Sequence, residues 1–313
     1  MKRFLGKGKV KAWSAVKSSP EGLFAVTVAA PATGGEGKPC VLACATLPDA
    51  EVGTPSLTAL SQRLGNQAAH WIFTLDRDDY QILVLPEPAA TPEELEQTIR
   101  WSISEQIAYP PDQASLAWMR IPDFERQPNR QQKLYVMVAP RALVDDYARK
   151  FREARLPLEV IDVHETAQRN IANLSAAPGE GVAMLRVAEH GIEFTISHEG
   201  ELHFHRWIQD ELGHGKLEPE AARRAMERLM LQIQRSLDYV DRNLPFIGLS
   251  RVLLAPLPRP MAMEEFLRSN LMLPVEKIDL ADCFDLSLTP ELLQEGSQAQ
   301  FFTALGSCLR YLK

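Results

Sequence analysis

The chain has 313 residues, of which 45% are hydrophobic and 24% charged, and a formal net charge of −7. This length favours two domains or two lobes, and the acidic balance argues against a nucleic-acid partner. No apolar run approaches the ~18 to 20 residues of a membrane-spanning helix, and no apolar secretion-signal segment follows the basic start. We therefore expect a cytoplasmic protein.

The first eleven residues carry five cations and no acid, namely Lys2, Arg3, Lys7, Lys9 and Lys11. Each cation close to an anionic lipid surface contributes about 1 kcal/mol of attraction. The sequence leaves two interpretations open: a contact with an anionic membrane surface, and a solvated start of the chain.

The next part of the chain is predicted to be rich in strands. Residues 10–30 form two apolar, β-branched runs joined by Ser-Ser-Pro-Glu-Gly, which predicts a hairpin. A third strand at 39–47, a short helix at 56–66, and strands at 70–76 and 80–87 are expected to follow.

The stretch TPEELEQTIRWSISEQIAYPP begins as a strongly specified helix. Thr91 and Glu94 form a capping box, and Pro110 with Pro111 forbids continuation. Trp101 falls off the predicted apolar face, which consists of Leu95, Ile99, Ile103 and Ile107. Two strands, 115–122 and 133–140, and a helix at about 141–155 follow. Residues 75–158 therefore predict a small α+β subdomain inserted into a larger lobe.

The remaining chain repeats the order seen at its start. The segment AAPGEG at 176–181 is a natural seam, strands are predicted at 182–208, and a helix of about 24 residues follows Pro219. The closing helix has an amphipathic stripe of Phe301, Leu305, Cys308, Leu309 and Leu312. We expect an α/β protein with two lobes, 1–178 and 179–313, which is the arrangement of an actin-like fold.

This order resembles the PilM family, the actin-like proteins of type IV pilus assembly. The resemblance covers nearly the whole chain and is carried by LPEPAATPEELEQTIRWSISEQIAYPPDQASLAW, VIDVHETAQRN, LMLQIQRSLDYV with SRVLLA, and FFTALGSCLRYL. It implies a non-enzymatic scaffold that docks the short tail of a PilN-like single-span protein at the cytoplasmic side of the inner membrane. The pilus assembly ATPase is a further implied partner.

The docking surface is expected at Trp101, Tyr109 and Pro110, because aromatic side chains commonly supply binding hot spots. The alternative is that Trp101 packs against the neighbouring lobe or the Tyr-Pro-Pro turn. The sequence leaves both interpretations open.

The resemblance also implies three nucleotide-binding loops, and the chain departs from each. The family's Gly-Ile-Asp-x-Gly pattern is matched by SAVKSSPEG, with Val16 near the acid's place, followed by Ser18 and Ser19 with no glycine before Gly22. Arg186 stands about where the second loop carries an acid. The third loop is matched by APLPRP, in which Pro256 cannot donate an N–H group. We therefore expect neither ATP nor magnesium as a cofactor. In these departures the chain looks most like the branch that serves the mannose-sensitive haemagglutinin pilus.

Two other functions remain open. The fold alone permits an actin-like nucleotide-binding ATPase or switch with ATP and magnesium. A relative of the cytoplasmic part of the type II secretion L protein would share the fold but normally continues into a membrane helix. His198, His203 and His205 lie close together in the sequence and have two interpretations: metal ligands, or exposed histidines of a strand. We favour the second and expect no metal site. The four cysteines lack a CxxC spacing and are expected to be reduced thiols.

Overall fold

The computed structural model describes residues 12–31, 37–65, 68–122, 131–188, 190–210, 212–213 and 218–312. The basic N-terminal segment from Lys2 to Lys11, for which a membrane contact is one interpretation, lies outside these ranges. Among the helices that the structure describes, none combines the length and hydrophobicity needed to span a bilayer.

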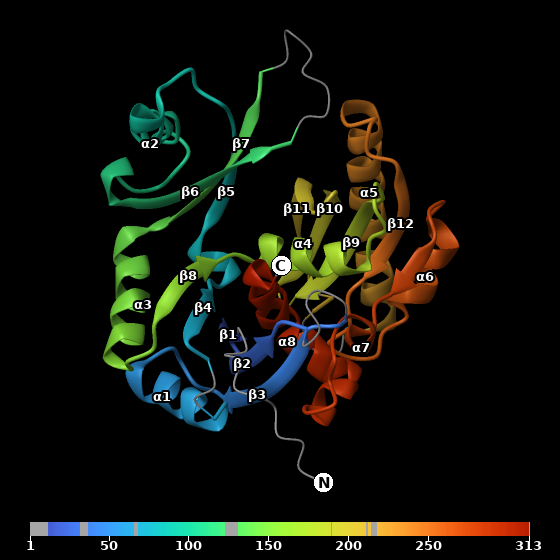
Figure 1. Ribbon diagram of the computed structural model, residues 1–313. Helices are drawn as coiled ribbons and strands as arrows, with labels where there is room; N and C mark the ends of the chain where they lie inside the picture. The colour runs from blue at the N-terminus through green and yellow to red at the C-terminus, as the bar shows by residue number, and fades with distance from the viewer. Residues whose placement is uncertain are drawn as a thin grey trace.

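Two five-stranded sheets of matching topology form the two lobes (Figure 1). In each sheet three antiparallel strands are followed by two parallel strands. The first sheet has the order β3 (Cys40–Pro48), β2 (Gly22–Ala29), β1 (Ala12–Ser19), β4 (His70–Thr74) and β8 (Leu158–Asp162). The second has the order β11 (Glu201–Gln209), β10 (Gly191–His198), β9 (Gly181–Ala188), β12 (Leu249–Leu254) and β13 (Val275–Lys277). The repeated order predicted from the sequence is therefore present.

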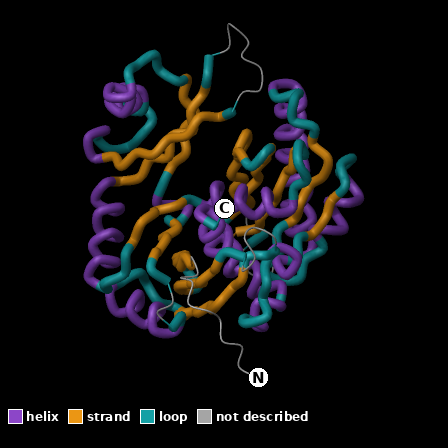
Figure 2. The backbone as a smooth tube through the Cα atoms, in the orientation of Figure 1, coloured by secondary structure: helices purple, strands orange, loops and turns teal. Residues whose placement is uncertain are grey.

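Helices cover the outer faces of both sheets and fill the space between them (Figure 2). The outer core of the first lobe lies under α1 (Thr54–Arg63) and α3 (Arg141–Glu153). That of the second lobe lies under α5 (Pro219–Asn243) and α6 (Met263–Asn270). Between the sheets lie α4 (His164–Ser175), α7 (Leu280–Cys283) and α8 (Glu295–Cys308). Short 3₁₀ turns are found at Arg77–Asp79, Pro111–Gln113, Pro290–Leu293 and Leu309–Tyr311.

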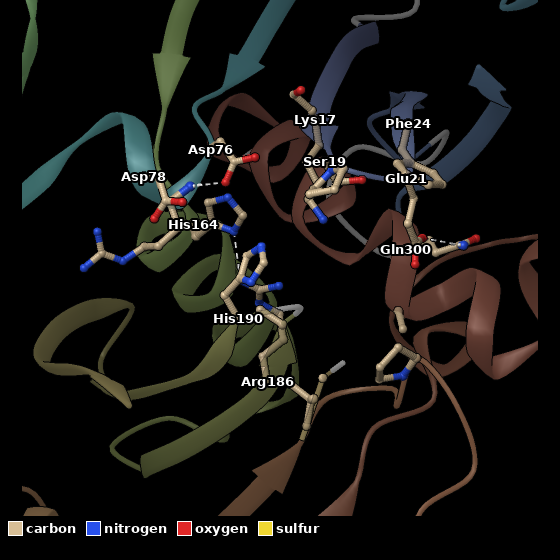
Figure 3. A pocket seen from close by; sticks show the side chains of 18 of the residues that line it. Lys17, Ser19, Glu21, Phe24, Asp76, Asp78, His164, Arg186, His190 and Gln300 are labelled. Atoms are coloured by element: carbon tan, nitrogen blue, oxygen red, sulfur yellow. Dashed lines mark hydrogen bonds between the residues drawn. The ribbon is translucent and has the colours of Figure 1, made fainter. Parts of the chain in front are cut away.

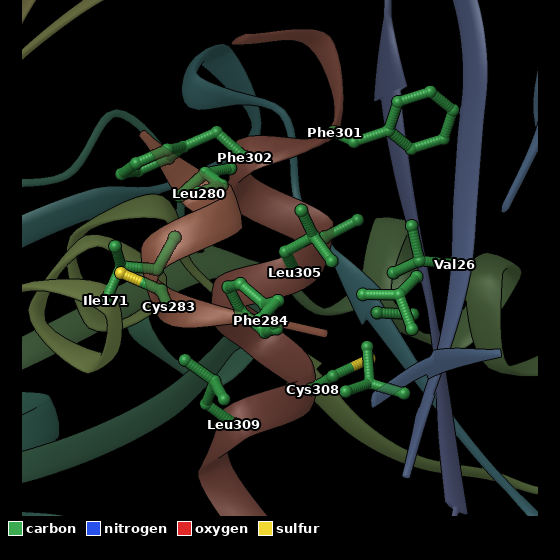
Figure 4. Packing of buried hydrophobic residues seen from close by; sticks show 14 of the residues in the cluster. Val26, Ile171, Leu280, Cys283, Phe284, Phe301, Phe302, Leu305, Cys308 and Leu309 are labelled. Atoms are coloured by element: carbon green, nitrogen blue, oxygen red, sulfur yellow. The ribbon is translucent and has the colours of Figure 1, made fainter. Parts of the chain in front are cut away.

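The core between the sheets joins the two lobes. It combines side chains of β1 and β2 with those of β9 and β12 around α8, as the packing of Val26, Phe301 and Leu305 shows (Figure 4). Every residue from Phe301 to Leu309 is buried. The prediction of an amphipathic closing helix is thus wrong in one respect: α8 is buried on all sides from Phe301 onward, because both lobes pack against this half of the helix.

The inserted subdomain has a sheet of its own, with the order β5 (Gln81–Pro86), β7 (Lys133–Pro140) and β6 (Ala114–Ile121). Its separate core forms between this sheet and α2 (Pro92–Ser102), through residues such as Ile99, Ile103 and Val136. The helix α3, which the prediction placed in the subdomain, packs on the core of the first lobe through Phe151.

The helix α2 ends at Ser102, eight residues before the first proline that was expected to stop it. The Ser102 hydroxyl donates to the Thr98 carbonyl, and the Ser104 hydroxyl donates to the Trp101 carbonyl. Such side-chain bonds compete with helical backbone bonds and favour turns. Ile103 nevertheless stays fully buried in the subdomain core, so the predicted apolar face survives in part beyond the helix.

Candidate functional site

The three loops singled out in the sequence converge on one cleft between the lobes (Figure 3). The β1–β2 turn contributes Ser18 and Ser19, β9 contributes Arg186, and the segment after β12 contributes Pro258. Pro256, the proline singled out in the sequence, does not line the cleft. The loops are therefore arranged around a shared space, as the resemblance implies. The proline that lines this space is Pro258, two residues after Pro256.

Val16 and Lys17 illustrate how strand alternation decides which side chain reaches the cleft. Successive residues of a strand point to opposite faces. Val16 is fully buried in the outer core of the first lobe, whereas Lys17 lines the cleft. The cation Lys17 therefore faces the cleft. It directly follows Val16, which the resemblance matches to the acid of the family's first loop.

Arg186 is held in a buried ion pair at the base of the cleft. Its side chain is 5% exposed, and its Nε and Nη2 atoms donate to Glu193 Oε2 at 3.0 and 2.6 Å. Nη2 also donates to His164 Nδ1 at 2.8 Å. Because an arginine only donates, His164 accepts through Nδ1 and carries its proton on Nε2. Burial and the Arg186 charge hold the pKa of His164 well below its usual value, so its ring is neutral.

Glu193 is an acid whose buried position opposes its charge. Burial raises the pKa of its carboxyl to about 7, even though Arg186 acts in the opposite direction and Glu165 adds to the rise. Burial also raises the pKa of Glu165, which accepts a hydrogen bond from the Tyr80 hydroxyl at 2.7 Å. Two buried carboxyl groups behind the lining of the cleft are thus engaged by internal contacts.

A second contact joins the lobes beside this network. The guanidinium of Arg77, which follows β4, lies 5.1 Å from the Tyr80 ring centroid and 5.4 Å from that of Trp207 on β11. Tyr80 belongs to the first lobe and Trp207 to the second, so Arg77 bridges them through cation–π contacts. Sequence reasoning missed this bridge, because only the fold brings its members together.

The cleft is small, and two of the three acids that line it are engaged. Its cavity has a volume of about 110 Å³, whereas pockets for ligands of drug size typically measure ~300 to 1,000 Å³. Asp76 accepts a hydrogen bond from the Arg77 N–H, and Glu21 accepts one from Gln300. Among the described residues, no group of three or more histidine, cysteine or acidic side chains is placed to hold a metal ion. The cleft is therefore poorly suited to a magnesium-bound nucleotide.

The histidines of β10 and β11 do not form a metal centre either. His198 and His203 are buried, which corrects the expectation of exposed strand histidines. Their rings lie 5.9 Å apart, and both contact Phe246. His205 packs edge-on against the Tyr135 ring with centroids 5.1 Å apart. These residues contribute to packing between α5, β11 and the inserted subdomain.

The predicted docking residues separate into two environments. Trp101 is 68% exposed and lines a groove with Pro111 and Arg141, so it does not pack against the neighbouring lobe. Tyr109 is half-buried against the subdomain core. Pro110 is exposed, and neither it nor Tyr109 lines the groove. The structure therefore brings Trp101 together with Pro111 and Arg141.

No protein-family model matches the chain, and no curated protein matches its sequence. The duplicated five-stranded sheets and the cleft between them form the two-lobed, actin-like fold that the sequence predicted. The chain is similar to a chain of the PilM-PilN type IV pilus biogenesis complex, with 17% identity over 98% of this chain and 100% of that one, and a TM-score of 0.75.

Two further solved structures are more distant. The cytoplasmic domain of EpsL, an inner membrane component of the type II secretion system of Vibrio cholerae, is 11% identical over 93% of this chain and 95% of its own, with a TM-score of 0.49. MreB5 of Spiroplasma citri, solved with ADP, is 8% identical over 97% and 100%, with a TM-score of 0.44.

Proposed function

We propose that this protein is a non-enzymatic scaffold of a type IV pilus assembly platform. It docks the short cytoplasmic tail of a PilN-like single-span protein and is thereby held at the cytoplasmic side of the inner membrane. The observation that supports this proposal is the likeness in fold, over 98% of the chain, to a chain of the PilM-PilN complex. A docking role needs no catalytic residues, which agrees with a cleft in which Arg186 is engaged by the buried Glu193.

Within this class we propose a protein of the MshI type, which serves the mannose-sensitive haemagglutinin pilus. The support comes from the three departures at the cleft: Lys17 faces it from β1, Arg186 from β9, and Pro258 from the segment after β12. None of these residues offers a carboxylate to a metal ion, and a proline cannot donate an N–H group.

We predict that magnesium-ATP at millimolar concentration neither stabilises the protein nor is hydrolysed. A ligand at 100 times its dissociation constant would add roughly 2.7 kcal/mol of stability, so a thermal-shift titration detects binding readily. Magnesium alone and ATP with a chelator are the controls. Arg186→Asp is expected to behave in the same way, because Lys17 and Pro258 remain. A saturable magnesium-dependent shift of the unmodified protein would contradict the proposal and favour the ATPase or switch.

The docking role is tested by binding. The fluorescein-labelled cytoplasmic tail of the PilN-like protein from the same genome is titrated with the full chain, and fluorescence anisotropy is measured. We expect saturable binding, and a scrambled tail is the control. If the native tail and the scrambled tail bind equally, or neither binds, the scaffold proposal is wrong.

A further inference from the structure

We propose that the protein's own side chains, through a latch on strand β11, hold the two lobes in one closed arrangement. On the second lobe the latch consists of His203, His205 and Trp207. On the first lobe it consists of Tyr135 in the inserted subdomain and Arg77 after β4. This gives the HFHRW segment of β11 a role between the lobes, and it does not rest on the scaffold function.

Tyr135 lies on the face of the subdomain sheet that points away from the subdomain core. Its neighbours on β7, Leu134 and Val136, are buried in that core, and successive residues of a strand point to opposite faces. The Tyr135 ring is nevertheless only 3% exposed. It packs against β11 of the second lobe, where the His205 ring meets it edge-on with centroids 5.1 Å apart.

A β-bulge in β11 offers a backbone acceptor to this tyrosine. The register of β11 on β10 shifts between Ile196 and Ser197, and the extra residue of β11 is His203. Bulges interrupt the ladder of a sheet and change the direction of local groups. The Tyr135 hydroxyl donates to the His203 carbonyl at 3.0 Å, and this hydrogen bond is buried. Loss of the hydroxyl therefore leaves a buried acceptor that water does not readily reach.

The second contact of the latch joins Trp207 to Arg77. Trp207 lies two residues after His205, so both side chains are on the same face of β11. Its ring packs closely over Gly191 of β10, since a Cβ atom placed there would lie 2.7 Å from its Cζ2 atom. The Arg77 guanidinium lies 5.4 Å from the ring centroid. The indole thus contacts the backbone of its own lobe and a cation of the other lobe.

Arg77 is positioned by contacts within the first lobe. Its Nη1 donates to the Tyr80 carbonyl at 3.0 Å, and its guanidinium lies 5.1 Å from the Tyr80 ring centroid. Its Nε lies 4.0 Å from Oε1 of the buried Glu165. A side chain that is already ordered loses little conformational entropy when it contacts the other lobe. The cation is therefore presented to Trp207 by the first lobe itself.

Both contacts fall on one edge strand. β11 is the outermost strand of the second sheet and the one nearest to the inserted subdomain (Figure 1). Native proteins cover or blunt such edges, because their backbone groups can pair with another chain. The shared core joins the lobes at the base, and the latch joins them a second time at β11. Rotation of the lobes about the base must therefore break both latch contacts.

The latch predicts that a nucleotide does not control the arrangement of the lobes. A ligand shifts a conformational equilibrium only through its different affinities for the two states, whereas the latch contacts are internal. The minor state of a two-state protein commonly holds ~0.1 to 10% of the molecules. Loss of both contacts is expected to raise the population of the open state about tenfold or more.

Distances between spin labels in different lobes test the latch on the full chain. The labels are attached at Glu93→Cys on α2 and Arg235→Cys on α5, two exposed positions. Cys40 and Cys44, the half-buried native cysteines, are replaced by serine. Double electron–electron resonance should show one narrow distance distribution for this parent protein. Magnesium-ATP should leave that distribution unchanged.

The latch variant is Tyr135→Phe with Trp207→Ala, which removes the hydrogen bond and the cation–π contact. It should broaden the distribution and add a longer distance between the lobes. The matched control is Tyr239→Phe with Trp101→Ala, which makes the same two substitutions at side chains that are 43% and 68% exposed. This control should give the distribution of the parent protein.

A second label pair separates opening from damage to the lobe. Labels at Arg235→Cys and Glu265→Cys lie within the second lobe, and their distance should be the same in every variant. If Trp207→Ala changes it, Trp207→Leu takes its place, because leucine keeps an apolar side chain over Gly191. With this distance intact, equal distributions between the lobes in the latch variant and its control would refute the latch. A parent distribution that is broad and becomes narrow with magnesium-ATP would also refute it, because a ligand would then set the arrangement.

Discussion

Arg186 shows how a single side chain changes what the cleft can do. A buried arginine is stable only when its charge is compensated, and here Glu193 and the neutral His164 both face it. The guanidinium therefore places a compensated positive charge at the base of the cleft. Removal of either member of the ion pair leaves the other buried without its counter-charge.

Arg186→Met is expected to lower the free energy of unfolding by about 3 to 5 kcal/mol, because Glu193 loses its counter-charge. The double variant Arg186→Met with Glu193→Met should recover most of this loss, since both charges are then replaced by apolar groups. Urea unfolding followed by circular dichroism measures all three proteins. If the single and the double variant are equally destabilised, the ion pair is not the cause.

His205 gives a prediction for pH dependence. Burial lowers the pKa of its ring to about 4 from a usual value of 6.5. Between these two pH values the unfolded chain binds a proton at His205 that the folded protein does not bind. The free energy of unfolding therefore decreases as the pH falls from about 6.5 towards 4. A difference of this size corresponds to about 3 kcal/mol.

The test compares the parent protein with His205→Gln in urea unfolding at pH 7 and at pH 5. The variant should lose less stability between these two values, because the glutamine does not titrate. The comparison cancels the contributions of Glu193, Glu165 and His164, which are present in both proteins. Equal losses in the two proteins would show that His205 does not carry this dependence.

At the scale of the elements, α4 and α8 approach each other very closely at one glycine. A Cβ atom placed on Gly306 would lie 2.3 Å from the Ala167 carbonyl oxygen. Gly306→Ala should therefore destabilise the protein by ~1 to 3 kcal/mol or more through overpacking. Gly296→Ala near the start of the same helix is the control, because the nearest atom to its Cβ would be 3.6 Å away.

The two glycine variants are compared by thermal unfolding. Gly296→Ala is expected to be neutral or slightly stabilising, because alanine is the better helix former. Gly306→Ala should lower the melting temperature. If both variants melt like the parent protein, the two helices have room to move apart.

Most elements could be predicted from the sequence because local signals specify them. The capping box at Thr91 defines the start of α2, and Pro219 marks the start of α5. The burial of α8 on all sides from Phe301 onward could not be predicted, because a helical period shows one apolar face but not how many neighbours surround it. The end of α2 was missed because the chain leaves the helix at Ile103, where the Ser104 hydroxyl donates to the Trp101 carbonyl, and not at a proline.

The candidate site could be predicted only in part. Ser18, Ser19 and Arg186 were located through the family resemblance, and strand alternation alone could have distinguished Lys17 from Val16. The contact between Arg186 and His164 could not be predicted from the sequence, because His164 lies on a different element and is 22 residues away. Trp101 was singled out because it lies off the apolar stripe, and its exposure fits that inference.

For the whole molecule, the shared core predicts that the two lobes unfold as one unit. Side chains of β1, β2, β9 and β12 all contact the central helices. A fragment of residues 12–178 lacks α8 and half of this core, so it should not fold to a native-like state. Near-ultraviolet circular dichroism and urea unfolding of the fragment and the full chain test this. A cooperative transition of the isolated fragment would contradict the prediction.

The position of α8 also has a consequence for synthesis on the ribosome. The Cys308 thiol donates to the carbonyl of Trp13, which lies 295 positions earlier in the chain. The inner face of the first lobe's sheet therefore stays uncovered by α8 until that helix has been synthesised. The inserted subdomain, by contrast, has all of its strands once residue 140 has left the exit tunnel. At ~5 to 20 residues per second, the interval before α8 follows is on the order of ten seconds or more. The strands and the helix of the inserted subdomain can thus pack together on the nascent chain while the lobes are still open.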